Sequence, residues 1–117
     1  MSVRREKIES LIHRALSVLL QQHFSHILLN EFLTVSAVSL NKSLSSAKVY
    51  ISTFHAKRPE ETFKLLKSHE KLLRKYLAQH VHHQLRYIPT LTLIMDTRES
   101  DADRLDKFFN TLSPPKT

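Results

Sequence analysis

The amino-terminal part of the chain carries apolar side chains at helical spacing. From residue 4 to about residue 27 they recur three or four positions apart, which predicts a long amphipathic helix. Glu6 and Glu9 fall in its early turns, where the positive end of the helix dipole favours acidic side chains. The apolar positions are Ile8, Leu11, Ile12, Ala15 and Leu19.

Two segments rich in Val, Ile, Thr and aromatic residues come next, at 32–40 and 47–54. They flank the polar stretch 41–46, and this arrangement predicts two strands joined by a hairpin connection. The apolar alternation of the first segment changes phase after Ala37, so we expect a β-bulge near that residue. Its apolar positions are Leu33, Val35 and Ala37, followed by Val38 and Leu40.

Pro59 followed by Glu60 and Glu61 is typical of a helix start. Neither proline nor glycine then occurs before Pro89, so we expect one long helix or two consecutive helices that Pro89 ends. Within residues 90–96, Leu91, Leu93 and Met95 alternate with Thr90, Thr92 and Ile94, which predicts a third strand. A short amphipathic helix is expected to close the domain, with apolar positions at Leu105, Phe108, Phe109 and Leu112.

The predicted order is therefore helix, strand, strand, helix, helix, strand. It indicates an α+β fold in which helices pack on one face of a three-stranded sheet, the topology of a type II KH domain. A chain of 117 residues fits one domain. We expect that domain at residues 1–112 and, because Pro114 and Pro115 begin a loose end, a flexible tail at 113–117.

Charge adds a function class to this picture. The chain has 18 basic and 11 acidic residues; residues 96–117 hold four bases and five acids, which leaves 14 bases and six acids, or +8, on residues 1–95. A basic excess on a small domain favours a polyanionic partner, and nucleic acid is favoured over an acidic membrane because no lipidation signal is present. Ordinary solubility charge is the alternative interpretation.

A helix over residues 63–86 would gather much of this charge into a stripe. Five cations would fall within an arc of about 100° at 100° per residue, with apolar residues opposite. Such a stripe can track phosphates, although a solvated helix face would look alike. His82 and Arg86 would extend it if the helix continued. The RNA-binding candidates are Lys64, Lys67, Lys71, Arg74, Lys75 and Arg86, and, more weakly, Arg4, Arg5, Lys7 and Lys42.

Enzymatic and metal chemistry lack the required residues. The chain contains neither glycine nor cysteine. Without glycine, phosphate-binding loops, dinucleotide fingerprints, the nucleophile elbow and the Gly-x-x-Gly loop of ordinary KH domains are excluded. His80 and His83 could share a helix face, but no third metal ligand is evident. We therefore expect no catalysis, cofactor, metal or small-molecule substrate. Tyr50 and Tyr87 are candidates for base stacking, although aromatic residues in strands are more often part of the core.

Location is inferred from what the chain does not contain. Its first ten residues, MSVRREKIES, form neither a secretory nor a transit signal. Apolar stretches stay far below the roughly 18 residues that cross a bilayer. We expect a soluble, monomeric, cytoplasmic protein without a membrane partner.

Two blocks of residues resemble the ribosome-binding factor A family. The first runs TVSAVSLNKSLSSAKVYI over residues 34–51, and the second runs LRYIPTL from Leu85 and continues through Asp96 to Arg104. Leu19-Leu20-Gln21 and Leu72-Leu73-Arg74 are also similar to family segments. The resemblance implies a type II KH-like factor that binds the rRNA of free or immature small ribosomal subunits, assists late rRNA processing and supports adaptation to cold.

The departures from the family pattern concern glycine. The family usually has Asp-Pro-Arg followed by glycine after its first helix, where this chain has His26-Ile27-Leu28, and a glycine at the position of Ala37. It also has Ala-x-Gly between the second and third helices, at the place of His69-Glu70-Lys71, and about two residues fewer near His82. The kink between these helices must therefore be made by ordinary residues or be weaker.

Two other functions remain open from the sequence. One is a generic RNA-binding or ribosome-associated KH-like protein without a maturation role. The other is a protein-interaction module whose basic stripe meets an acidic partner.

Overall fold

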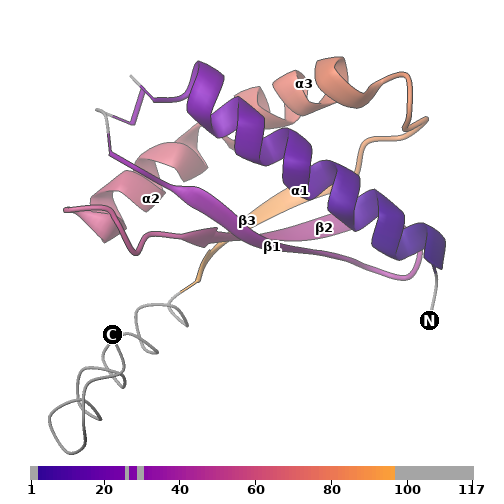
Figure 1. Ribbon diagram of the computed structural model, residues 1–117, viewed down its shortest axis with the longest axis horizontal. Helices are drawn as coiled ribbons and strands as arrows, with labels where there is room; N and C mark the ends of the chain where they lie inside the picture. Colours follow the sequence, from indigo (N-terminus) through magenta and orange to yellow (C-terminus); the bar gives the residue numbers. More distant parts are fainter. Residues whose placement is uncertain (1–2, 26, 29–30, 97–117) are drawn as a thin grey trace, which may run out of the picture.

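A computed structural model describes residues 3–25, 27–28 and 31–96. Their elements follow the predicted order: α1 (Val3–His23), β1 (Thr34–Leu40), β2 (Ser46–Ser52), α2 (Pro59–Ser68), α3 (Glu70–Val81) and β3 (Thr90–Asp96). The three helices lie on one face of the sheet (Figure 1). The predicted α+β fold is thus confirmed. The expected helix on Leu105 to Leu112 and the tail at 113–117 lie outside the described residues.

The sheet has the order β1-β2-β3. β1 and β2 form an antiparallel hairpin, and the register between them shifts from Val35 to Ala37, where the bulge was predicted. β2 and β3 are parallel. A parallel pair needs a crossover connection, and α2 and α3 supply it. β3 is therefore an edge strand of this sheet, directly beneath the helices that carry the basic stripe.

The hydrophobic core lies between the helices and the inner face of the sheet. α1 buries the side of the helix that contains Ile12 and Leu16, and the central strand β2 buries alternate residues. α2 and α3 close the layer with Leu66, Leu73 and Leu77, all fully buried. The buried residues of the central strand are Ala47, Val49 and Ile51.

Two helices are shorter than predicted. α1 ends at His23 because Phe24 and Leu28 both turn into the core, with a single turn closed by the Leu28 N–H on the Phe24 carbonyl at 2.9 Å. α3 ends at Val81, well before Pro89, and the Val81 carbonyl accepts the N–H groups of both Gln84 and Leu85. Arg86 therefore lies in the loop between α3 and β3 and does not extend the helical stripe.

The break between α2 and α3 forms at His69 without glycine. The backbone there has φ −107° and ψ 22°, which an ordinary residue adopts. The Leu65 carbonyl, which would continue the helix, instead accepts the Ser68 hydroxyl at 2.6 Å and the His69 Nδ1–H at 2.9 Å. Two polar side chains thus replace a helical hydrogen bond, and this competition interrupts the helix.

The β1–β2 loop is organised by one amide side chain. Asn41 Oδ1 accepts the backbone N–H groups of Ser45 and Ser46, and its Nδ2 donates to the hydroxyls of Ser43 and Ser45. Leu44 adopts φ 62° in this turn, a left-handed conformation that glycine would take at lower energy. Its half-buried side chain packs against the core and compensates part of that strain.

Candidate nucleic-acid interface

The helical stripe is exposed, as predicted. Lys64 and Lys67 lie on α2, while Lys71, Arg74 and Lys75 lie on α3. All five residues are exposed to solvent. Two of them, Lys67 and Arg74, also bind backbone atoms of the domain, so part of the stripe supports the fold.

Lys67 belongs to the group that covers the free edge of β3. Its Nζ lies 3.4 Å from the Leu93 carbonyl oxygen, and the neighbouring Glu70 carboxylate accepts the Leu93 N–H at 2.9 Å. Both polar atoms of the Leu93 backbone are thereby occupied by side chains from α2 and α3. Covering an edge in this way hinders the addition of a further strand.

Arg74 connects α3 with the segment that leads into β3. Its Nε donates to the Pro89 carbonyl at 3.1 Å, and its Nη2 donates to the Ile88 carbonyl at 2.8 Å. Two parallel donors of this kind suit the forked guanidinium group and would not suit lysine. Arg74 therefore holds the 88–89 segment in place while it remains exposed at the surface.

The structure brings other predicted cations together in a pocket of about 750 Å³. Arg4 and Lys7 come from the first turns of α1, and Arg86 comes from the loop after α3. Ser43, Leu44 and Ser45 of the β1–β2 loop complete one side, with Lys42 adjacent in the chain. No acidic residue lines this pocket among the described residues. We call it the basic pocket.

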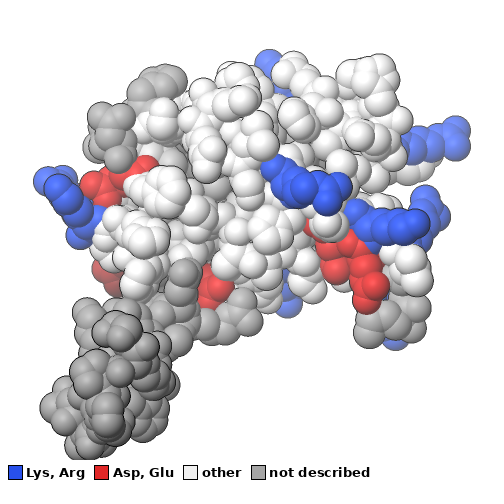
Figure 2. Space-filling model, in the orientation of Figure 1, with Lys and Arg blue, Asp and Glu red and all other residues white. Residues whose placement is uncertain are grey.

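Figure 2 shows how charge is distributed over one face of the molecule. Basic side chains gather at the end where α1 begins, beside a small acidic group, and much of the remaining face is uncharged. Arg5, a further predicted residue, is half-buried on α1 and does not line the basic pocket. One acidic residue of α1, Glu9, is committed to the fold, because its carboxylate accepts the Leu40 N–H at 2.8 Å.

Tyr87 belongs to the rim of the same pocket and is 78% exposed. The Arg86 guanidinium lies 5.9 Å from the centre of its ring. Tyr50, the other aromatic candidate, is half-buried in β2. The sequence already identified Tyr87 as a stacking candidate, but the exposure of its ring depends on α3 ending at Val81.

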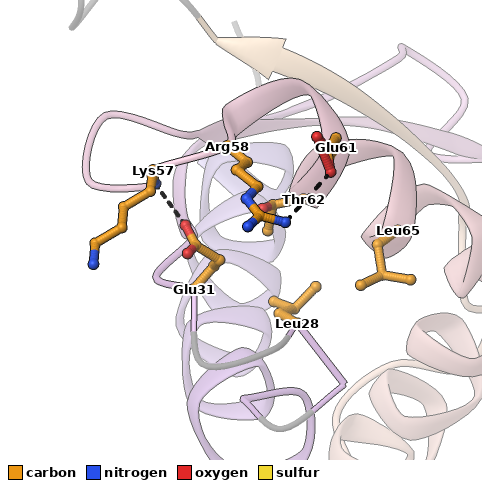
Figure 3. Close-up of a pocket in the computed structure, with 7 residues that line it drawn as sticks. All are labelled: Leu28, Glu31, Lys57, Arg58, Glu61, Thr62 and Leu65. Carbon is orange, nitrogen blue, oxygen red and sulfur yellow. Dashed lines mark hydrogen bonds and ion pairs between the residues drawn. The ribbon is translucent and has the colours of Figure 1, made fainter.

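A second pocket, of about 520 Å³, has a different character. Figure 3 shows Glu31 beside the backbone of Lys57 and Arg58 beside Glu61, while the Lys57 side chain points away from the other labelled residues. Glu31 accepts the backbone N–H of Lys57 at 2.6 Å, and Arg58 lies 3.9 Å from the Glu61 carboxylate. With acids and bases balanced, this pocket offers no attraction for a polyanion. It lies at the start of α2, at the other end of the domain from the start of α1 (Figure 1).

The part of the chain that the structure describes contains no cluster of three His, Cys, Asp or Glu residues able to hold a metal ion. His80 lines a shallow pocket with Gln84 between α1 and α3, while the rings of His82 and His83 are 3.8 Å apart at the end of α3. In the same described residues, no helix is both long and apolar enough to cross a bilayer.

Comparison with known proteins agrees with the fold. The family described as ribosome-binding factor A matches residues 4–109. The ribosome-binding factor A of Chlorobium phaeobacteroides is 34% identical over 108 residues, which cover 92% of this chain and 91% of the relative. The crystal structure of ribosome-binding factor A from Thermus thermophilus superposes with a TM-score of 0.63 at 30% identity, covering 78% of this chain and 94% of the other.

A further match is a homology model of a relative that was fitted into a map of a complex. Coordinates of the Thermus thermophilus protein fitted into a cryo-electron-microscopy map of a 30S–RbfA complex match with a TM-score of 0.62 at 30% identity. That match covers 77% of this chain and 92% of the other. Sequence blocks, fold and relatives therefore agree, and the chain belongs to the ribosome-binding factor A family.

Proposed function

We propose that this protein is an assembly factor of the small ribosomal subunit, which binds the rRNA of free or immature subunits and assists late rRNA processing. The observation that carries the proposal is the match to a relative whose coordinates were fitted into a 30S–RbfA complex. The family match over residues 4–109 extends this likeness to nearly the whole chain.

The basic surface supports RNA as the contacted component. Three cations from two distant segments line the basic pocket, and no acid lines it among the described residues. The stripe adds Lys64, Lys71 and Lys75, for which no intramolecular ion pair is seen in the same part of the chain. Such a surface releases counterions when it meets phosphates. The fold acts as a type II KH-like platform that lacks a Gly-x-x-Gly loop, so phosphate contacts and RNA shape provide most of the affinity.

The mechanism is binding without catalysis. The protein stabilises one rRNA conformation over another, and the shift is limited by the difference in its affinity for the two states. No nucleotide is consumed by this chain. We place this activity in the cytoplasm and expect the protein to act as a monomer, with its domain at 1–112 and a tail at 113–117.

Sedimentation tests the proposal directly. Protein mixed with ribosomal particles should travel with free or immature small subunits and should be scarce on large subunits and translating ribosomes. Depleting it from cells should accumulate unjoined small subunits with incompletely processed rRNA, and more so in the cold, where misfolded RNA escapes more slowly. Stoichiometric presence on translating ribosomes, or normal subunit profiles after depletion, would support generic RNA binding instead.

A further inference from the structure

The basic pocket differs from the stripe in being concave and partly aromatic. Three segments that are far apart in the chain meet there: the start of α1, the β1–β2 loop and the loop before β3. Its volume of about 750 Å³ lies within the range of roughly 300–1,000 Å³ typical of pockets that bury a small organic group. A surface that only tracked a phosphate backbone would not need such a hollow.

We propose that the basic pocket binds a single unpaired RNA nucleotide, with its base stacked on Tyr87 and its flanking phosphates on Arg4 and Lys7. This inference rests on the proposed function, because it assumes that the protein binds RNA. It adds that one base must leave the helical stack of the RNA to be held.

The aromatic ring carries the first step of the argument. Tyr87 is the most exposed large hydrophobic residue of those described, at 78%, and it is beside Arg86. The other strongly exposed residues, Val3 and Phe32, are not part of this pocket. Aromatic rings and arginine planes are the groups on which unstacked bases pack, while the bases of an A-form duplex remain stacked inside. An exposed ring within a cationic rim therefore fits a splayed base.

The polar groups of the pocket carry the second step. Arg4, Lys7 and Arg86 can meet phosphates on either side of the base. The hydroxyls of Ser43 and Ser45 lie 2.8 Å apart and both accept from Asn41 Nδ2. Since one hydroxyl donates to the other, the second retains a hydrogen that can donate to an acceptor on a base edge. The loop thus adds hydroxyl groups to a pocket that is otherwise lined mostly by cations and apolar side chains.

The stripe and the pocket are connected through Arg74. Its guanidinium holds the carbonyl oxygens of Ile88 and Pro89, and both of these residues line the basic pocket. RNA whose backbone follows α3 can therefore pass directly to the rim of the pocket. This continuity favours a nucleotide within a longer RNA over a free phosphate or an acidic peptide.

Replacing Tyr87 tests the inference. The probes are a single-stranded RNA of about 12 nucleotides, close to the site sizes of single-strand binders, and an RNA duplex of equal length, each at fixed ionic strength. Tyr87→Ala should weaken single-strand binding about 5-fold to 150-fold, as expected for loss of one stacked base, and should leave duplex binding within about twofold. Tyr87→Phe keeps the ring and should bind like wild type. Because the Tyr87 side chain is largely exposed, Tyr87→Ala should fold normally, and thermal unfolding checks this.

Matched variants separate stacking from charge. Phe32→Ala removes an exposed aromatic residue outside the basic pocket and should leave the affinity for both RNAs unchanged. Arg4→Ala with Lys7→Ala should reduce the log-log salt slope for the single strand by roughly 0.7 for each phosphate that is no longer neutralised, whereas Tyr87→Ala should leave the slope unchanged. Lys57→Ala, at the other end of the domain, should leave both affinity and slope unchanged.

The results also distinguish this inference from the proposed function. Suppose that wild type binds small subunits, but Tyr87→Ala weakens binding to the single strand and to the duplex equally, or weakens binding to neither. The nucleotide pocket is then wrong, and the assembly role stands. Competition by polyglutamate as strong as by the single-stranded RNA would identify the pocket as a general anion site and overturn the inference. If wild type binds neither RNA nor small subunits, the proposed function itself fails.

Discussion

The carboxylate of Glu70, in the first turn of α3, accepts a 2.9 Å hydrogen bond from the backbone N–H of Leu93 on the edge strand β3. The contact is half-buried and joins residues 23 positions apart. It couples the helices of the stripe to the sheet, so the position of α3 depends on a polar side chain as well as on the core.

Removing this carboxylate should therefore destabilise the fold. Glu70→Ala leaves the Leu93 N–H without its partner and also removes a negative charge from the amino end of α3, so we expect a loss of about 1–2 kcal/mol in the free energy of unfolding. Glu70→Gln keeps an acceptor oxygen and should lose less. Urea denaturation measures both. A loss for Glu70→Ala no larger than that for Lys71→Ala would show that the hydrogen bond contributes nothing.

Arg74 offers a test of positioning against charge. Arg74→Lys keeps the positive charge but cannot make both hydrogen bonds to Ile88 and Pro89. We expect it to lose up to about 1 kcal/mol in unfolding free energy, close to Arg74→Ala, because the contact with Ile88 is exposed. It should also weaken single-strand RNA binding through movement of the pocket rim. Wild-type stability and affinity in Arg74→Lys would mean that only its charge matters.

Three lysines of the stripe should contribute affinity without contributing stability. Lys64, Lys71 and Lys75 are exposed, and no hydrogen bond from their side chains is seen within the described residues. Replacing all three with Glu should strongly weaken binding to folded rRNA, while each substitution changes the unfolding free energy by no more than about 0.5 kcal/mol. Filter binding over a range of salt concentrations measures the first effect. Unchanged affinity would move the main contact to Arg4, Arg5 and Lys7.

The β1–β2 loop gives a prediction about pocket shape. Asn41→Ala removes the acceptor of two backbone N–H groups and the donor to two hydroxyls. Since the loop is exposed, water replaces part of these bonds, and we expect a loss of about 1 kcal/mol in the free energy of unfolding. Single-strand RNA affinity should fall as well, because Ser43 to Ser45 line the pocket. Asn41→Asp keeps the acceptor and serves as control for the backbone bonds.

The local features of this fold were predictable from the sequence because each depends on neighbouring residues. A period of two in the apolar pattern defined the three strands, and the change of phase at Ala37 located the bulge. Pro59 with two glutamates marked the first residue of α2. These signals act over a few residues, so the rest of the fold is not needed to interpret them. The family resemblance also rests on a local block, residues 34–51, and the family match over residues 4–109 confirms it.

The tertiary structure alone decided where helices stop and which cations meet. Local propensity would have allowed α3 to continue to Pro89, but the helix ends at Val81. The chain then turns back so that β3 begins at Thr90, which pairs with Ser46. That early end places Arg86 and Tyr87 in a loop, where they meet Arg4 and Lys7 from the other end of the chain. It also places the Ile88 and Pro89 carbonyls where Arg74 donates hydrogen bonds to both. These contacts form by packing between elements that are distant in sequence, so the apolar pattern of a single segment cannot predict them.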